Sequence, residues 1–309
     1  MNPAFSVIFL TTLIGAGQGL FLALYAAELA GVPAGPAASG LYFVGAAWSL
    51  VLCGLGLAAS FFHLGHPERA WRAAAMWRTS WLSREVIALP LFMAGVFAWG
   101  GAHALGSPAS RWLGAVATVL CLALFVCTAM IYASIRFLQE WASPLTLLNY
   151  TLLGCASGAT LASALVALRL SPADAAPFAA AALGLTLAGL ASRAASLRRN
   201  ALLKPRSTLQ SAIGVKHPAV VQRAQGFMGG SFNTREFFHG RNAAFLRSVK
   251  WFFLAAAFVL PAALLAAAPG SSAALALAFV VQFAGLLAER WFFFAQANHP
   301  QNLYYQAIS

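Results

Sequence analysis

Long apolar stretches alternate along the chain with short polar connections. Eight of these stretches approach or exceed the roughly 20 residues that a helix needs to cross a bilayer. Their hydrophobicity is continuous and does not alternate, so the pattern predicts helices and not the strands of a membrane barrel. The predicted spans are residues 3–30, 39–62, 85–105, 112–135, 145–168, 177–197, 251–268 and 272–294.

The composition indicates the same class of protein. Hydrophobic residues make up 61% of the chain and charged residues 8%, whereas a typical soluble domain has roughly 25% charged residues. The first apolar stretch has no Lys or Arg before it and is longer than the core of a signal peptide, so we expect a retained helix. The predicted fold class is an all-α integral membrane protein, a polytopic bundle of about eight transmembrane helices that forms a single membrane domain over residues 1–309.

Charged residues are distributed unequally between the two ends of the predicted helices. Of the 19 Lys and Arg residues, all but Arg111 and Arg169 fall at the end that carries both termini, as do all of the seven acids except Glu28 and Asp174. Basic residues gather on the cytoplasmic side of membrane proteins, so we expect both termini in the cytoplasm. The net charge of +12 therefore reports topology, and a chain with no polar domain is not expected to bind nucleic acid.

The largest polar feature is residues 193–250, a predicted cytoplasmic loop that is rich in Lys and Arg and contains one acid, Glu236. Such a loop can fix the topology and touch anionic lipids. Its length and its interleaved phenylalanines favour a surface that packs on a partner protein, since an apolar core with a polar rim is typical of interfaces. The candidate docking residues are Arg223, Arg235, Arg241 and Arg247.

A histidine and a glutamate flank the connection between the second and third spans. His63 ends the second span and Glu85 begins the third, so the two can face each other across adjacent helix ends. Ionisable groups at membrane depth are costly and usually functional, and this pair suits the proton chemistry of a quinone. The alternative is that His63 caps a helix end and Glu85 pairs with Arg84 or Arg69.

Other polar residues lie within the spans or at their edges. Gln18 stands among glycines that allow close helix approach, and Tyr132 and Arg136 lie at the same membrane face as His63. Each can be part of a quinone site, or can form an interhelical hydrogen bond or an interfacial anchor. Glu289 and Arg290, in the last span, are expected to form a partly buried ion pair.

The chain does not supply ligands for a metal centre of its own. The four cysteines stand singly in apolar stretches, which favours small core residues over an iron–sulfur or zinc site. A haem held by two histidines needs ligands inside facing helices, and His103, near a span, lies at the opposite membrane face from His63. We therefore expect no metal and no haem in this chain.

Five motifs resemble those of the DMSO reductase anchor subunit family: GAGQG, FHLGHPERA, SWLSREV, IYASI and LAERWFFF. The resemblance covers most of the chain. It implies an anchor in the bacterial inner membrane for a ferredoxin-like iron–sulfur subunit and a molybdopterin catalytic subunit, in a complex of anaerobic respiration. The anchor would exchange electrons and protons with menaquinone or ubiquinone and carry no haem, iron–sulfur cluster or molybdenum itself. The family's quinol-site residues correspond to His63 and Glu85, with Ser83 in the same motif as Glu85.

One departure from the family bears on the substrate. The 193–250 loop looks longer than in DMSO reductase anchors and resembles that of anchors of cytoplasm-facing sulfite dehydrogenases, which send electrons toward quinone. The sequence thus favours sulfite oxidation slightly over S-oxide reduction. Two other classes stay open: a secondary transporter or permease, and a purely structural anchor that electrons bypass.

Overall fold

The computed structural model describes residues 1–33, 36–221, 223 and 236–303, and of His63 it describes the backbone alone. Within these residues the fold is all helical, and eight helices are long and apolar enough to cross a membrane. The predicted fold class is therefore confirmed. The spans are α1 (Phe5–Ala30), α2 (Pro36–Ser60), α3 (Trp81–Ala104), α4 (Ser110–Ala133), α5 (Pro144–Arg169), α6 (Pro172–Ala201), the composite α9 (Ala243–Leu254), η3 (Ala255–Val259) and α10 (Leu260–Ala267), and α11 (Ser272–Ala295).

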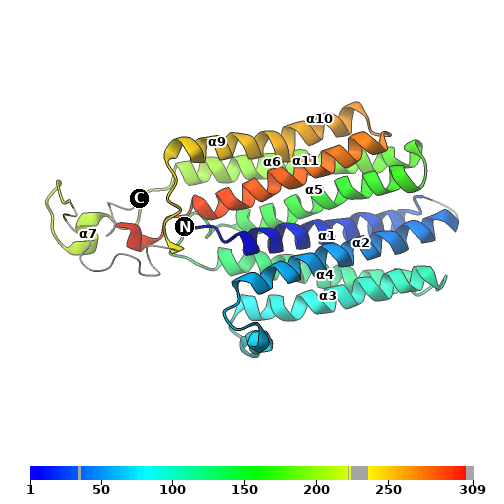
Figure 1. Cartoon of the computed structure of the whole chain (residues 1–309), viewed down its shortest axis with the longest axis horizontal. Helices are drawn as coiled ribbons and strands as arrows, with labels where there is room; N and C mark the ends of the chain where they lie inside the picture. Colours follow the sequence, from blue (N-terminus) through cyan, green and yellow to red (C-terminus); the bar gives the residue numbers. More distant parts are fainter. Residues whose placement is uncertain (34–35, 222, 224–235, 304–309) are drawn as a thin grey trace.

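Four short helices lie in the connections: η1 (Phe61–His63), η2 (Pro67–Met76), α7 (Leu209–Ile213) and η4 (Pro300–Leu303). The spanning helices run side by side, with α1 and α5 in the middle of the bundle, α3 and α4 at one edge and α9 and α10 at the other (Figure 1). Met1, η2 and α7 lie at one end of the bundle, which we call the basic end (Figure 1). The opposite end is called the far end.

Side-chain caps set where several spans begin. Ser80 accepts a hydrogen bond from the Ser83 N–H at the start of α3, and Ser143 accepts one from Leu145 at the start of α5. Ser171 and Ser271 cap α6 and α11 in the same way. Such caps satisfy backbone N–H groups that have no partner within the helix.

Two predicted spans were too short at their basic ends. Helix α6 continues to Ala201, and α9 begins at Ala243, where the side chain of Asn242 caps it. The connection between the two spans is therefore residues 202–242 and not 193–250. Charged residues continue helices readily, so charge alone was a poor guide to where these helices end.

The segments at the basic end are held together by hydrogen bonds to backbone carbonyls. The amino group of Met1 donates to the carbonyl of Ala297 at 2.8 Å, and the Asn2 N–H donates to the carbonyl of Glu236 at 2.8 Å. The guanidinium of Arg199, on α6, donates to the carbonyl of Gln139 at 3.0 Å. These contacts link the start of α1 to the segment after α11, and α6 to the connection between α4 and α5.

Glycines let α1 and α5 approach within backbone contact. A Cβ placed on Gly158 would lie 2.0 Å from the backbone nitrogen of Leu20, and one on Gly19 would lie 2.1 Å from the carbonyl oxygen of Gly154. Small residues allow this approach in membranes, where dispersion and close packing hold helices together. The position of α1 in the middle of the bundle depends on this contact.

We therefore expect Gly158→Ala to lower the free energy of unfolding by about 1–3 kcal/mol, because the added methyl group meets backbone that cannot move aside. Gly184→Ala on α6 is the matched control, since nothing lies within 4 Å of a Cβ there. Denaturant unfolding of the detergent-purified protein measures the difference. Equal stability of the two variants would contradict the close contact.

Candidate functional site

Glu85 is a buried carboxyl close to the basic end of α3. It lies in the second turn of the helix, is 8% exposed, and accepts a hydrogen bond from the Thr128 hydroxyl of α4 at 2.5 Å. No Lys or Arg of the described residues lies within 4 Å of its oxygens. The carboxyl thus has one neutral hydrogen-bond donor and no ion-pair partner there, and a buried charge in that state is costly.

The predicted alternative partner of Glu85 is engaged elsewhere. The guanidinium of Arg84 lies over the ring of Trp81, 4.2 Å from its centre, and donates to the carbonyls of Trp77 and Arg78. Arg69 instead lies 3.7 Å from Glu68, at the surface. The interpretation of Glu85 as a partner of Arg84 or Arg69 is therefore wrong.

A small cavity adjoins Glu85, and we call it the Glu85 cavity. Its volume of about 10 Å³ is close to what one water molecule needs. Gln18 of α1 lines it and donates from Nε2 to the carbonyl of Cys121 at 2.9 Å, while being 2% exposed. The full lining is Thr11, Ile14, Gly15, Gln18, Glu85, Phe125, Thr128 and Tyr150. Two of the predicted site residues, Glu85 and Gln18, are thus brought together.

Tyr132 lies one turn beyond Thr128 on α4, close to this cavity. Its ring stacks on that of Tyr150 with centres 5.7 Å apart and meets the edge of Trp141 at 5.5 Å. Tyr150 lines the Glu85 cavity together with Glu85. Tyr132 therefore adjoins the predicted site through Tyr150, although it does not line the cavity.

The other predicted site residues are placed less centrally. Ser83 is buried, and its N–H is part of the cap that begins α3. Arg136 follows α4 and is exposed, away from the cavity lining. His63 ends η1, which directly follows α2, so its backbone lies at the basic end as Glu85 does. Its side chain lies outside the described part of the structure, so its pairing with Glu85 stays a prediction.

The candidate docking residues that the structure describes are all at the surface. Arg223 and Arg241 are exposed in the connection between α6 and α9, and Arg247 is exposed on α9. The guanidinium of Arg241 lies 5.2 Å from the ring centre of Phe245. Arg235 lies outside the described residues.

Sequence reasoning missed a buried ionic group, the Arg193–Glu289–Arg290 cluster. Nε of Arg193 lies 2.7 Å from Oε1 of Glu289, and Nη1 of Arg290 lies 3.8 Å from Oε2. All three residues are at most 5% exposed. The closer partner of Glu289 is therefore Arg193, and the ion pair predicted between neighbours Glu289 and Arg290 is fully buried. No local signal pointed to Arg193, since it lies 96 positions before Glu289.

A second cavity adjoins this cluster, and we call it the Arg290 cavity. It also measures about 10 Å³ and shares Thr11 and Gly15 with the Glu85 cavity. Its lining is Thr11, Thr12, Gly15, Leu153, Gly154, Ser157, Leu286 and Arg290. Both shared residues belong to α1, so α1 borders the two cavities.

At the far end, Glu28 forms a separate buried polar group. Its carboxylate accepts hydrogen bonds from Trp99 Nε1 at 2.7 Å and from the Ser110 hydroxyl at 2.6 Å, and Nε2 of His103 lies 3.3 Å away. These contacts join α1, α3 and α4. The location of His103 at the end opposite Glu85 agrees with the sequence prediction.

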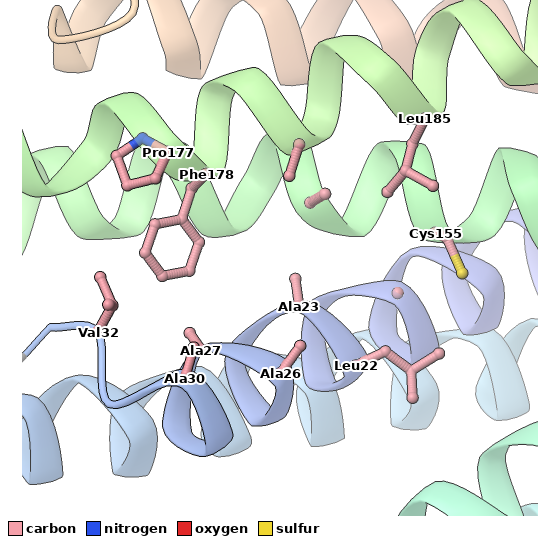
Figure 2. A pocket seen from close by; sticks show the side chains of 13 residues that line it. Leu22, Ala23, Ala26, Ala27, Ala30, Val32, Cys155, Pro177, Phe178 and Leu185 are labelled. Atoms are coloured by element: carbon pink, nitrogen blue, oxygen red, sulfur yellow. The ribbon is translucent and has the colours of Figure 1, made fainter.

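A larger, almost wholly apolar pocket opens between α1, α5 and α6 in the half of the bundle nearer the far end (Figure 2). Its volume is about 420 Å³. Leu22, Ala23 and Ala26 of α1 face Phe178 and Leu185 of α6 across it (Figure 2). Gly19, which contacts α5, also lines it, one residue from Gln18.

The cysteines behave as small core residues. Cys53, Cys121 and Cys127 are buried, Cys155 is half-buried, and none is in a disulfide. Among the described residues no group of three His, Cys, Asp or Glu side chains is placed to hold a metal ion.

Fold and site together define a polytopic helical membrane protein with a buried carboxyl and a layer of polar groups near its basic end. The chain belongs to the DMSO reductase anchor subunit (DmsC) family, which matches residues 1–305. A curated relative, a sulfite dehydrogenase subunit from Allochromatium vinosum, is 56% identical over 328 aligned positions that cover all of both chains. The family predicted from the five motifs is confirmed, and the relative agrees with the sulfite dehydrogenase branch.

Within the described residues, the Thr128 hydroxyl is the only donor that hydrogen-bonds the Glu85 carboxyl. Loss of this hydrogen bond should therefore be measurable. We expect Thr128→Val to lower the free energy of unfolding by about 1–3 kcal/mol, because a buried carboxyl then has no donor. Thr128→Ser retains the hydroxyl and should be close to wild type. Denaturant unfolding measures both free energies of unfolding. Equal decreases in the two variants would mean that Thr128 stabilises the protein by packing and not through its hydroxyl.

Proposed function

We propose that this chain is the quinone-reactive membrane anchor of a molybdopterin oxidoreductase of the sulfite dehydrogenase type. It would exchange electrons and protons between the quinone pool and a ferredoxin-like iron–sulfur subunit. Family membership supports the anchor role, and the name of the 56% identical relative supports sulfite as the substrate of the complex. The observation that carries the quinone role is the buried Glu85 carboxyl, with a water-sized cavity, at the end where His63 also lies.

The residues near Glu85 suit a quinone. A quinone carries two electrons and two protons, and it needs groups that hydrogen-bond its carbonyl oxygens and exchange protons with them. His63 and Glu85 would do so, with Tyr132 nearby. The Glu85 cavity has room for a water molecule and not for a quinone ring. Its part in the proposal is therefore to hold water that exchanges a proton with the Glu85 carboxyl.

The orientation follows from the distribution of charge. The connections at the basic end carry most of the Lys and Arg residues, whereas the far end has Arg111 and Arg169. By the positive-inside rule the basic end faces the cytoplasm. We therefore propose a protein of the bacterial inner membrane with both termini, and the docked partner subunits, on the cytoplasmic side.

The quinone role predicts a selective loss of activity in the purified complex. His63→Ala and Glu85→Gln should lower sulfite-dependent reduction of a soluble quinone analogue at least about 100-fold, the contribution typical of a positioned acid or base. Reduction of an artificial dye that meets the partner subunits directly should persist.

His66→Ala is the matched control, since His66 is an exposed neighbour that pairs with Glu68 at 3.0 Å. It should leave both activities unchanged. Normal quinone reduction by the His63→Ala, Glu85→Gln double variant would identify the chain as a purely structural anchor.

The docking role predicts a salt-sensitive interface. Replacing Arg223, Arg241 and Arg247 together by Gln should release the peripheral subunits from membranes at lower salt than wild type, because charge attraction across an interface is screened by ions. Arg111→Gln with Arg169→Gln, at the far end, is the control. Sedimentation of washed membranes measures how much of the peripheral subunits stays bound. Unchanged binding would mean that these arginines set the topology and contact lipid but do not hold the partner subunits.

A further inference from the structure

The Arg193–Glu289–Arg290 cluster has a net charge of +1. Two guanidinium groups share a single carboxylate, and none of the three residues is more than 5% exposed. Removing charge from water inside a membrane is expensive, so an unbalanced buried cation needs a counter-charge. The cluster alone does not provide one.

Several atoms of the cluster also have unused hydrogen-bonding capacity. Nη2 of Arg193, Nη1 of Arg290 and Oε2 of Glu289 are buried without a hydrogen-bond partner. The Arg290 guanidinium lies over the ring of Tyr150, 3.5 Å from its centre, and Arg290 lines the cavity named after it. The excess charge is thus at the edge of a space that has room for a water molecule.

Glu85 has the opposite imbalance, because its carboxyl is buried and the described residues place no cation beside it. Its buried carboxyl has a hydroxyl donor and no cation of the described residues within 4 Å. Glu85 lines the Glu85 cavity, Arg290 lines the Arg290 cavity, and Thr11 and Gly15 line both. Tyr150 also lines the Glu85 cavity, and its ring packs against the Arg290 guanidinium.

We propose that Arg290 is the counter-charge of Glu85, acting across the two small cavities, and that it favours the ionised form of the Glu85 carboxyl. The four charged groups Glu85, Arg290, Glu289 and Arg193 then sum to zero. The step concerned is transfer of a single proton between the Glu85 carboxyl and water in the Glu85 cavity. Arg290 is a positioning residue in this scheme. Its importance for turnover rests on the proposed quinone function, but its effect on Glu85 does not.

Other groups facing Glu85 are neutral or directed elsewhere. Helix α4 presents Cys127, Thr128 and Tyr132, α1 presents Thr11 and Gln18, and α5 presents Tyr150. Arg84, the next residue on α3, has its guanidinium over Trp81. His63, at the end of η1, is the remaining titratable group on the α2 side. Around Arg290, the charged neighbours are Glu289 and Arg193.

The test reads the protonation of Glu85 without using turnover. Infrared difference spectra of the purified complex, recorded over a pH titration, contain the carbonyl band of a protonated carboxyl, and Glu85→Gln identifies the part that belongs to Glu85. Arg290→Gln removes the excess positive charge, so the ionised carboxyl is less favoured and the midpoint should rise. We expect a rise of about one pH unit, the lower end of the shift that a neighbouring opposite charge gives a carboxyl.

Two further variants make the result specific. Arg290→Lys keeps the charge and should restore the midpoint to within about 0.3 pH unit of wild type. Glu289→Gln raises the excess charge, so the midpoint should fall. Arg198→Gln is the matched control, because it removes one exposed cation from α6 and should leave the midpoint unchanged.

An unchanged midpoint in Arg290→Gln, or equal rises in Arg290→Gln and Arg290→Lys, would overturn the proposal. If Glu289→Gln does not assemble because two arginines are left unpaired, the comparison of Arg290→Gln with Arg290→Lys decides. Failure of the quinone function has a different signature, because the infrared midpoints would then shift as described while the wild-type complex reduced no quinone.

Discussion

The contact between the backbones of α1 and α5 sets the geometry on which the rest of the site depends. A methyl group at Gly158 or Gly19 would overlap the backbone of the facing helix, so this approach is possible only for glycine. It holds Thr11, Gly15 and Gln18 of α1 between Glu85 on one side and Arg290 on the other. A separation typical of leucine-packed helices would open these cavities to lipid or move Gln18 away from Cys121.

The polar and charged groups near the basic end form one layer. Glu85, Thr11, Tyr150 and Arg290 each lie within about two helical turns of the basic end of their own helix. Membrane helices tolerate such residues when they face the bundle interior and find partners there. These four residues come from four different helices, so the layer exists only in the assembled bundle and no single helix would retain it.

Sequence reasoning succeeded where the signal was local. Continuous hydrophobicity located all eight spans, and their order determined which connections share an end of the bundle. It erred at residues 193–201 and 243–250, because the charged residues there predicted a loop although both stretches are helical. Residue 193 was consequently assigned to the start of the predicted loop, although Arg193 is buried against Glu289.

The site was predicted in part for a similar reason. Glu85 and Gln18 were recognised because a carboxyl and an amide are rare within apolar stretches, and the structure places both at one cavity. Thr11 and Thr128 were missed because threonine is ordinary in membrane helices, where its hydroxyl can bond to a carbonyl of the preceding turn. Tyr150 was missed because nothing in the sequence tells which side chains it faces in the bundle. These three residues matter because α1, α4 and α5 meet around Glu85, and the packing of helices against one another cannot be deduced from a single sequence.

The apolar half of the bundle has a consequence for energy conservation. Between the polar layer and the Glu28 group, the core is filled by side chains such as Phe21, Leu24, Phe92 and Val96, which are fully buried. Protons exchanged at Glu85 would therefore enter and leave on the side from which the electrons come. If the chain reacts with quinone as proposed, its turnover would move no net charge across the bilayer, so it would feed the quinone pool without itself contributing to the membrane potential.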